Sequence, residues 1–309
     1  MTDTPFPVDP VLQAIAIAYR NMSYIADSVL PRVMVAKDTF KYWEYPIEET
    51  FFLPDTKVGR KSQPNEIDLT ATEKTTSTEN FGLDDPIPQD DIDNAPENFS
   101  PVDNAVVQIT DYILLDREKR TSDLVFKQAT YPAGNRVQLS GNSQWSDFTN
   151  SDPIGDIMAG LDACLVRPNV GVFGQETWTK LSQHPDINKA IHGTSGDTGV
   201  ARRQAVAELF ELEEIVVGQS RLNTAKKGQT ATLSRIWGKH CALIHRNRLA
   251  DTQRGLTFGY TAQWGGRISG QMPDPKIGLK GGVRVRVGES VKELIAASQA
   301  AYYIEDAIA

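Results

Sequence analysis

Between Lys37 and Gln89 the chain carries too few apolar side chains to form a core of its own. The aromatic residues of this segment are concentrated near its start, and threonine is common in the long polar stretch that follows Leu53. In that stretch Ile67 and Leu69 alternate with polar residues, a pattern typical of strands rather than of a helix. We therefore predict an extended hairpin here, which either lies free in solvent or packs on another molecule.

A long helix is predicted after this segment. Ser100 is a good capping residue, Pro101 suits the first helical position, and Asp103 places an acid in the first turn. Apolar residues then recur at helical spacing as far as Val125. Their spacing drifts in the middle, and they fit a helix of about seven turns. This should be the longest helix of the chain, because the Pro132 region ends any continuation.

A shorter amphipathic helix is predicted to begin at Asp9 and to reach at least Tyr19. Asp9 is a capping residue, and the proline after it fits the first turn. Val11, Leu12 and Ile15 share one face of this helix. That face must find a partner, either in the core of the chain or on a neighbouring subunit.

The middle third alternates between strand and helix patterns, which is typical of a compact α/β unit. Its most informative part runs from Glu214 to Asn247, where a buried strand, a polar loop and a second apolar run follow one another. The predicted elements are a helix capped by Asp152, a strand at 170–173, a short helix around Trp178 that stops at His184, a helix at 203–210, a strand at 215–218, a polar loop at 219–228, and apolar residues at 236–238 and 242–244.

The last third reads mainly as strands. Residues 256–264 form a strand pattern, and residues 265–282 are rich in glycine and proline, which predicts a loop. Ser290 and Glu293 form a capping box, which predicts the start of a helix. Residues 302–304 are predicted to close the chain as an edge strand.

Composition and charge exclude several classes of protein. At 309 residues the chain can bury a substantial core in one or two domains. Its net charge of −8 argues against a dedicated nucleic-acid binder, because such proteins cluster Lys and Arg to neutralise phosphates. No apolar run is long enough to cross a membrane and no signal peptide is evident, so folding in the cytosol is expected. Cys164 and Cys241 lie in apolar patterns and are expected to be small core residues.

Residues that could carry out chemistry are sparse. The four histidines form no paired metal-binding motif, and neither a phosphate-binding loop nor a dinucleotide motif is present. His192, Ser195 and Asp197 lie in one glycine-rich loop, whereas a catalytic triad draws its members from separate elements. We therefore predict no catalytic, cofactor-binding or metal-binding residues. A hydrolase that uses His192 and Ser195 is the alternative from a different class.

One segment is strongly acidic, since no Lys or Arg occurs from Thr75 to Asp116. It is predicted to be a solvated loop or a surface that meets basic residues of a neighbouring copy. The spacing of its acids lacks the glycine and the terminal glutamate of a calcium-binding loop. The acids that cluster there are Asp84, Asp85, Asp90, Asp91, Asp93 and Glu97.

Arg284 and Arg286 lie in a run, 283–287, whose strict alternation predicts a strand with one apolar face. The two arginines share the other face of that strand. They are expected either to be solvated or to pair with carboxylates of a neighbouring subunit.

The order of these parts resembles the major capsid proteins of tailed bacteriophages, which have the Hong Kong 97 fold. A terminal arm, an extended hairpin, a long helix, an α/β unit and a return through strands follow one another over residues 10–305. The residues that carry the resemblance lie in short sequence segments at 167–170, 178–187, 215–218, 221–225 and 236–238.

This resemblance implies an α+β fold. Its parts would be an N-terminal arm (1–36), an extended E-loop hairpin (37–89), a peripheral domain with a spine helix (90–150), an axial domain (151–250) and return strands of the peripheral domain (251–309).

The resemblance further implies a structural subunit, not an enzyme, that self-assembles into hexamers and pentamers of an icosahedral virus head. The head would enclose packaged double-stranded DNA without sequence-specific binding, and it would form in the host cytoplasm. Because the chain starts with no long helical leader, a separate scaffolding protein is expected, together with a portal and a candidate decoration protein, and no cofactor or membrane is involved. An encapsulin-like nanocompartment shell, which shares the fold, is the nearest alternative.

Contacts between subunits are predicted from the placement of residues in this layout. Lys57 and Lys61 stand where some family members form isopeptide bonds, but no asparagine partner can be identified, so no crosslink is predicted. The residues predicted to contact another subunit are Trp43, Tyr45, Lys57, Lys61, Asp90, Asp91, Arg284 and Arg286.

Overall fold

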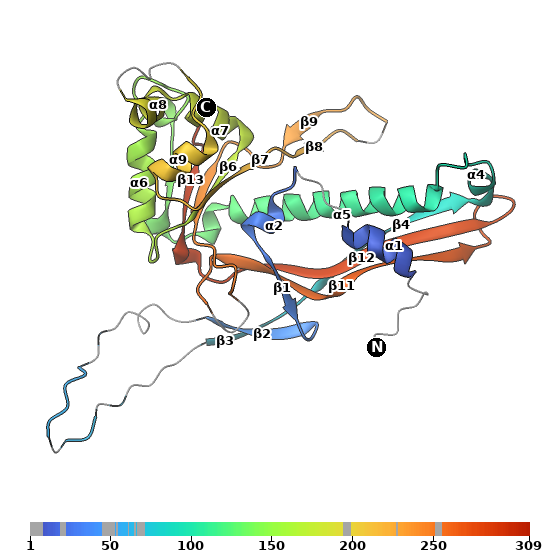
Figure 1. Cartoon of the computed structure of the whole chain (residues 1–309), viewed down its shortest axis with the longest axis horizontal. Coiled ribbons are helices and arrows are strands. Elements are labelled where there is room, and N and C mark those ends of the chain that lie inside the picture. Colours follow the sequence, from blue (N-terminus) through green and yellow to red (C-terminus); the bar gives the residue numbers. More distant parts are fainter. Residues whose placement is uncertain are drawn as a thin grey trace.

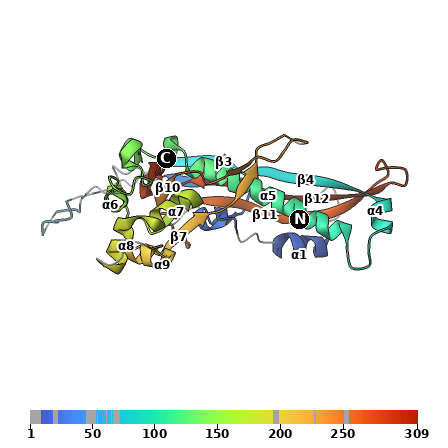
Figure 2. The same cartoon turned by 90° about the horizontal axis from the view of Figure 1, so that it is seen from above.

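Two β-sheets and one long helix organise the computed structural model, which describes residues 9–18, 23–44, 53, 55–60, 62–64, 66, 72–193, 199–226, 228–250 and 255–309. A four-stranded sheet and the long helix form an elongated unit, and a five-stranded sheet with several helices forms a rounded unit at one end of it (Figure 1). Figure 2 shows the same division from above, with the helices of the rounded unit gathered at one end of the molecule.

The sheet of the elongated unit, here called the long sheet, has the strand order β1-β11-β12-β4. Its two central strands are antiparallel and more than twice the length of a typical strand. The strands are β11 (Gly259–Asp274), β12 (Gly282–Ile295), β4 (Glu79–Pro88), which is antiparallel to β12, and β1 (Arg32–Val35), which is parallel to β11.

Two local predictions for the long sheet are wrong. Much of the segment 265–282, predicted to be a loop, continues β11, and its first two glycines, Gly265 and Gly266, instead lie at a β-bulge between Trp264 and Ile268. The capping box of Ser290 and Glu293 starts no helix, because both residues lie in β12 and pair with β11. Hydrogen bonding to neighbouring strands outweighs the local capping signal here.

The extended hairpin is shorter than predicted. β2 (Thr39–Glu44) and β3 (Thr72–Ser77) form a two-stranded ribbon of their own, and the next strand, β4, joins the long sheet instead. The predicted hairpin is therefore wrong for residues 79–88, because β12 offers these residues a full row of hydrogen-bonding partners. The alternating residues Ile67 and Leu69 lie outside the described residues.

The predicted long helix is confirmed as α5 (Pro101–Val125), the longest helix among the described residues. Its cap is also confirmed, because Ser100 Oγ accepts a hydrogen bond from the backbone N–H of Asp103 at 3.2 Å. α5 packs one apolar face on the long sheet. The buried residues at this contact are Ala105, Val106, Ile109 and Ile113 of α5, Ile87 of β4, and Val285 and Val287 of β12.

α1 (Pro10–Ala18) lies beside α5 and β11 (Figure 1). Asp9 caps it as predicted, accepting a hydrogen bond from the backbone N–H of Val11 at 2.8 Å. The predicted apolar face is only partly right, since Leu12 is buried but Val11 is 66% exposed. Two further short helices, α2 (Ala26–Val29) and α4 (Gln89–Asp93), flank the elongated unit.

The rounded unit is built on a mixed sheet with the strand order β5-β13-β10-β6-β7. Its strands are β5 (Arg136–Gln138), β13 (Ala301–Glu305), β10 (Cys241–Ile244), β6 (Val170–Gly174) and β7 (Glu214–Gly218). The prediction that 302–304 form an edge strand is wrong, because β13 pairs with β5 on one side and with β10 on the other.

Helices and loops cover both faces of this second sheet. Its helices are α6 (Pro153–Ala163), α7 (Gln175–Gln183), α8 (Pro185–His192) and α9 (Arg203–Leu209), of which α8 was not predicted. Leu161, Leu181 and Val206 from these helices form one core with the sheet, and the residues of the opposite face, such as Val172 and Tyr303, pack near the end of α5. The α/β unit predicted for the middle third is therefore confirmed.

Two short strands leave the rounded unit as a hairpin arm, defined here as residues 219–235. β8 (Arg221–Asn223) and β9 (Leu233–Arg235) pair in it, where the sequence predicted a polar loop. The remaining elements are single 3₁₀ turns: η1 (Gln128–Thr130), η2 (Ala133–Asn135), η3 (Gly141–Ser143) and η4 (Ser298–Ala300). In the part of the chain that the structure describes, no helix is both long and apolar enough to cross a membrane.

Candidate assembly interface

A buried carboxylate joins the two units. Glu118 of α5 accepts hydrogen bonds from the backbone N–H groups of Ile25 and Ala26 and from the Trp237 indole N–H, the last at 2.5 Å. The Ser220 hydroxyl donates a further hydrogen bond at 3.2 Å. Burial raises the pKa of Glu118, and these donors oppose the shift. The carboxylate is satisfied only while all of these elements stay in place, so it fixes the rounded unit to α5.

A second buried network lies beside it. Arg117 of α5 is almost fully buried and donates to Asp27 Oδ1 at 2.5 Å. Glu289 of β12 lies between Arg32, at 2.9 Å, and Arg267, at 3.0 Å. Burial alone would raise the pKa of Glu289, but the two arginines hold it below its usual value. The two ion pairs of Glu289 join β12 to β1 and to β11.

One feature of the sequence is related to these networks. The spacing of apolar residues drifts in the middle of α5. Polar residues occupy the buried face of the helix there: Arg117, Glu118, Thr121 and Ser122. A break in an apolar stripe on a long helix was therefore a sign of buried polar contacts, although it could not reveal their partners.

Arg284 and Arg286, predicted to contact another subunit, have carboxylate partners in their own chain. Arg284 Nη2 donates to Asp274 Oδ2 at 2.8 Å, and Arg286 Nε donates to Asp84 Oδ1 at 2.6 Å. Hydrogen bonds from these arginines hold the pKa values of Asp84 and Asp274 below their usual range. The pairs line the face of β12 opposite to α5, so an additional role at a subunit contact stays a prediction.

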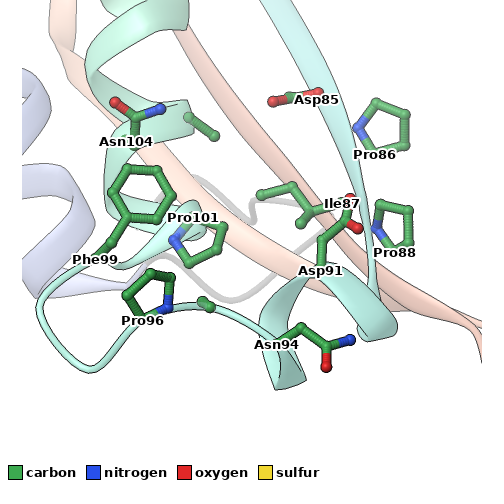
Figure 3. A pocket seen from close by; sticks show the side chains of 12 residues that line it. Asp85, Pro86, Ile87, Pro88, Asp91, Asn94, Pro96, Phe99, Pro101 and Asn104 are labelled. Atoms are coloured by element: carbon green, nitrogen blue, oxygen red, sulfur yellow. The ribbon is translucent and has the colours of Figure 1, made fainter.

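Asp90 and Asp91, the predicted acidic contacts, lie at the tip of the elongated unit. Lys280 Nζ donates to Asp90 Oδ1 at 2.6 Å. Asp91 lines a cavity of about 480 Å³, here called the tip pocket, between the end of β4, α4 and the start of α5 (Figure 3). Prolines and Phe99, which is 49% exposed, supply much of its wall. Asp85 also lines the pocket, which therefore combines an apolar wall with two acidic side chains.

The remaining predicted contacts belong to the two-stranded ribbon of β2 and β3 and to the segment that joins its strands, residues 45–71, here called the ribbon extension. The ribbon is attached at its base, where Phe40 packs near Tyr260 of β11. Trp43 pairs with Glu73 through the backbone of β2, and Lys57 is exposed. Tyr45 and Lys61 lie outside the described residues.

The residues considered for chemistry form no metal cluster in the part of the chain that the structure describes, since no group of three or more His, Cys, Asp or Glu there could hold a metal ion. His192 ends α8, and Ser195 and Asp197 lie outside the described residues. Cys164 and Cys241 are free, and burial raises the pKa of the Cys164 thiol to about 12, which leaves it unreactive at neutral pH.

The arrangement of the chain matches solved structures. A phage-related protein from Bordetella bronchiseptica RB50 superposes with a TM-score of 0.75, covering 98% of each chain at 23% sequence identity. A chain of the capsid structure of cyanophage P-SCSP1u superposes with a TM-score of 0.61 at 11% identity, covering 93% of this chain and 89% of that one. These likenesses define the class of the fold, which is the α+β fold of the Hong Kong 97-like capsid proteins.

Sequence comparison adds the family, although no family model matches. The chain is 55% identical over 309 residues, the whole of both chains, to the major capsid protein of Pseudomonas phage JBD67. It is 30% identical over 286 residues to the major capsid protein of Burkholderia phage BcepMu, covering 88% and 89% of the two chains. The chain belongs to the phage major capsid proteins and is a structural subunit of a capsid.

Proposed function

We propose that copies of this chain form the hexamers and pentamers of an icosahedral phage head, which encloses packaged double-stranded DNA. The two-stranded ribbon of β2 and β3 carries this proposal. Two strands alone are marginally stable in water, and beyond its base the extension exposes apolar side chains, among them Leu53 at 89% and Val58 at 47%. A second copy that covered this ribbon would stabilise it.

Exchange of such ribbons around a ring would give each subunit several contacts at once. Contacts that are individually weak then act together, so the shell is stable although each interface is modest. The predicted contact residues Trp43, Tyr45, Lys57 and Lys61 belong to this exchange. The acidic net charge of −8 supports a shell that encloses DNA without binding it tightly.

The same proposal includes the other components of head assembly. A scaffolding protein and a portal would direct closure of the shell in the host cytoplasm, and a decoration protein could bind its outer surface. Both curated relatives come from phages, which supports a phage head rather than an encapsulin-like compartment.

Removal of the ribbon extension tests the proposal. Residues 45–71 would be replaced by a short Gly-Ser linker, and the variant would be expressed beside the wild type, each with the scaffolding protein. The wild type should form closed particles in negative-stain microscopy. The variant should give a folded subunit, shown by an unchanged circular dichroism spectrum, but no particles. Closed particles from the variant, or none from the wild type, would overturn the proposal.

A further inference from the structure

Two segments of this chain have opposite and unmixed charge. Residues 75–116 contain ten Asp and Glu residues and no Lys or Arg. Residues 215–250 contain seven Lys and Arg residues and no Asp or Glu. The first segment includes the tip pocket, and the second includes the hairpin arm. Such separation in a chain of mixed composition favours electrostatic pairing of the two surfaces.

The acids at the tip divide into two kinds. Asp84 and Asp90 are paired with Arg286 and Lys280 of the same chain. Asp85 and Asp91 line the tip pocket and, among the described residues, no Lys or Arg lies within salt-bridge distance of either. The pocket therefore presents two carboxylates that remain available to a cation from outside the chain.

The apolar wall of the pocket adds to its selectivity. Figure 3 shows Pro96 and Pro101 beside Phe99 on one side of the pocket and Pro86 and Pro88 on the β4 side, with Asp91 on α4 between them. A cavity of about 480 Å³ can take one or two side chains, but not a folded element. The matching ligand is a long side chain with an apolar stem and a cationic head, which is lysine or arginine.

The hairpin arm supplies such side chains. Arg221 and Lys226 are exposed, and among the described residues neither has a carboxylate partner, whereas Arg235 pairs with Glu176. Leu233 pairs with Asn223 in the same hairpin and is 59% exposed, so an apolar side chain accompanies the cations. A short exposed hairpin can enter a contact without unfolding any core.

We infer that the hairpin arm of one copy docks its free cations in the tip pocket of a second copy. Within one chain the arm leaves the rounded unit, while α4 and the pocket lie at the far tip of the long sheet (Figure 1). Each copy therefore offers one donor surface and one different acceptor surface. Such a head-to-tail contact repeats from copy to copy, and it gives a ring when the rotation between neighbouring copies closes. The inference rests on the proposed assembly and names the surfaces that meet in it.

Charge reversal tests the docking. The pocket variant carries Asp85→Lys and Asp91→Lys, the arm variant carries Arg221→Glu and Lys226→Glu, and the exchange variant carries all four and keeps the wild-type net charge. Each reversal should raise the protein concentration needed for half-maximal assembly by at least about tenfold, and the exchange variant should return to within about threefold of the wild type. Light scattering would follow assembly, and circular dichroism would confirm that the free subunits are folded.

A crosslink gives an independent readout. Chains with Asp91→Cys and chains with Lys226→Cys are mixed and oxidised, and a two-chain product should appear in the mixture above the level of wild-type chains, whose cysteines are the control. Its absence from assembled particles would overturn the inference.

The possible failures are distinguishable. If wild-type shells form and either reversal assembles at the wild-type concentration, or the exchange variant does not recover, only the docking inference is overturned. If the arm variant assembles normally but its particles lose DNA, the hairpin arm binds nucleic acid instead. The docking inference is then also overturned. If the wild type forms no shells with its scaffold, the proposed function fails, and the inference fails with it.

Discussion

The rounded unit and the elongated unit are held together in different ways. The rounded unit buries both faces of its sheet in two large apolar clusters. The long sheet buries one face beneath α5 and covers the other with ion pairs such as Arg286 with Asp84. A sheet with one polar face and an unpaired edge depends less on its own core and leaves surface for partners. The rounded unit should therefore determine folding, and the elongated unit should determine assembly.

The largest expected effect lies at Trp237, which joins the two units. Trp237→Ala removes a fully buried indole and a donor to Glu118, and it should lower the free energy of unfolding by about 3–5 kcal/mol. Urea denaturation of the free subunit would measure the change. Tyr112→Ala on the same helix, α5, is the control, since Tyr112 is 59% exposed and its loss should cost under about 0.5 kcal/mol. Equal effects would mean that the junction does not stabilise the chain.

A smaller effect is expected inside the long sheet, at Glu289. Glu289→Gln removes the buried carboxylate that lies between the guanidinium groups of Arg32 and Arg267, so the free energy of unfolding should fall by about 3 kcal/mol. Glu79→Gln, which removes an exposed partner of Lys292, should cost under about 1 kcal/mol. If both variants unfold at the same urea concentration, the stability of the long sheet does not depend on its buried ion pairs.

The contribution of the polar face of the long sheet to stability should depend on pH. Asp84 has a lowered pKa in the folded chain, so its stabilising effect is present above the unfolded pKa of about 3.9 and is lost as pH falls through the folded value. Asp84→Asn should cost under about 1 kcal/mol at neutral pH. The difference from the wild type should disappear in acid. Urea denaturation across this pH range would measure it, with Asp123→Asn as the exposed control, and a difference that persisted in acid would assign the effect to packing.

The sequence was sufficient where the signals were local. The Ser100 cap, the length of α5 and the alternating α/β pattern are each set by neighbouring residues, and all three predictions are confirmed. The order of the parts pointed to the capsid family, which the relatives confirm.

The sequence misled where a distant strand decides the structure. Ser290 and Glu293 looked like a helix start, yet pairing with β11 makes them part of a strand. Arg284 and Arg286 were assigned correctly to one face, but their partners lie on the neighbouring strands, Asp274 on β11 and the distant Asp84 on β4. The tip pocket could not be predicted for another reason. Its lining residues all fall within residues 85–105, but the pocket exists only because β4, α4 and the start of α5 fold back on one another there. The residue pattern of this stretch does not show that turn of the chain.

The smallest effect on folding is expected in the ribbon extension, where the contrast between folding and assembly is sharpest. Lys57 is exposed, so Lys57→Gln should change the free energy of unfolding by less than about 0.5 kcal/mol. If the ribbon extension lies on another copy, the same variant should nevertheless need more protein to assemble. Lys127→Gln, which changes another exposed lysine near the end of α5, should not. Light scattering on the two variants would compare them. Because folding is unaffected in both, a loss of assembly in the first variant alone can arise only from a contact that the isolated subunit does not make.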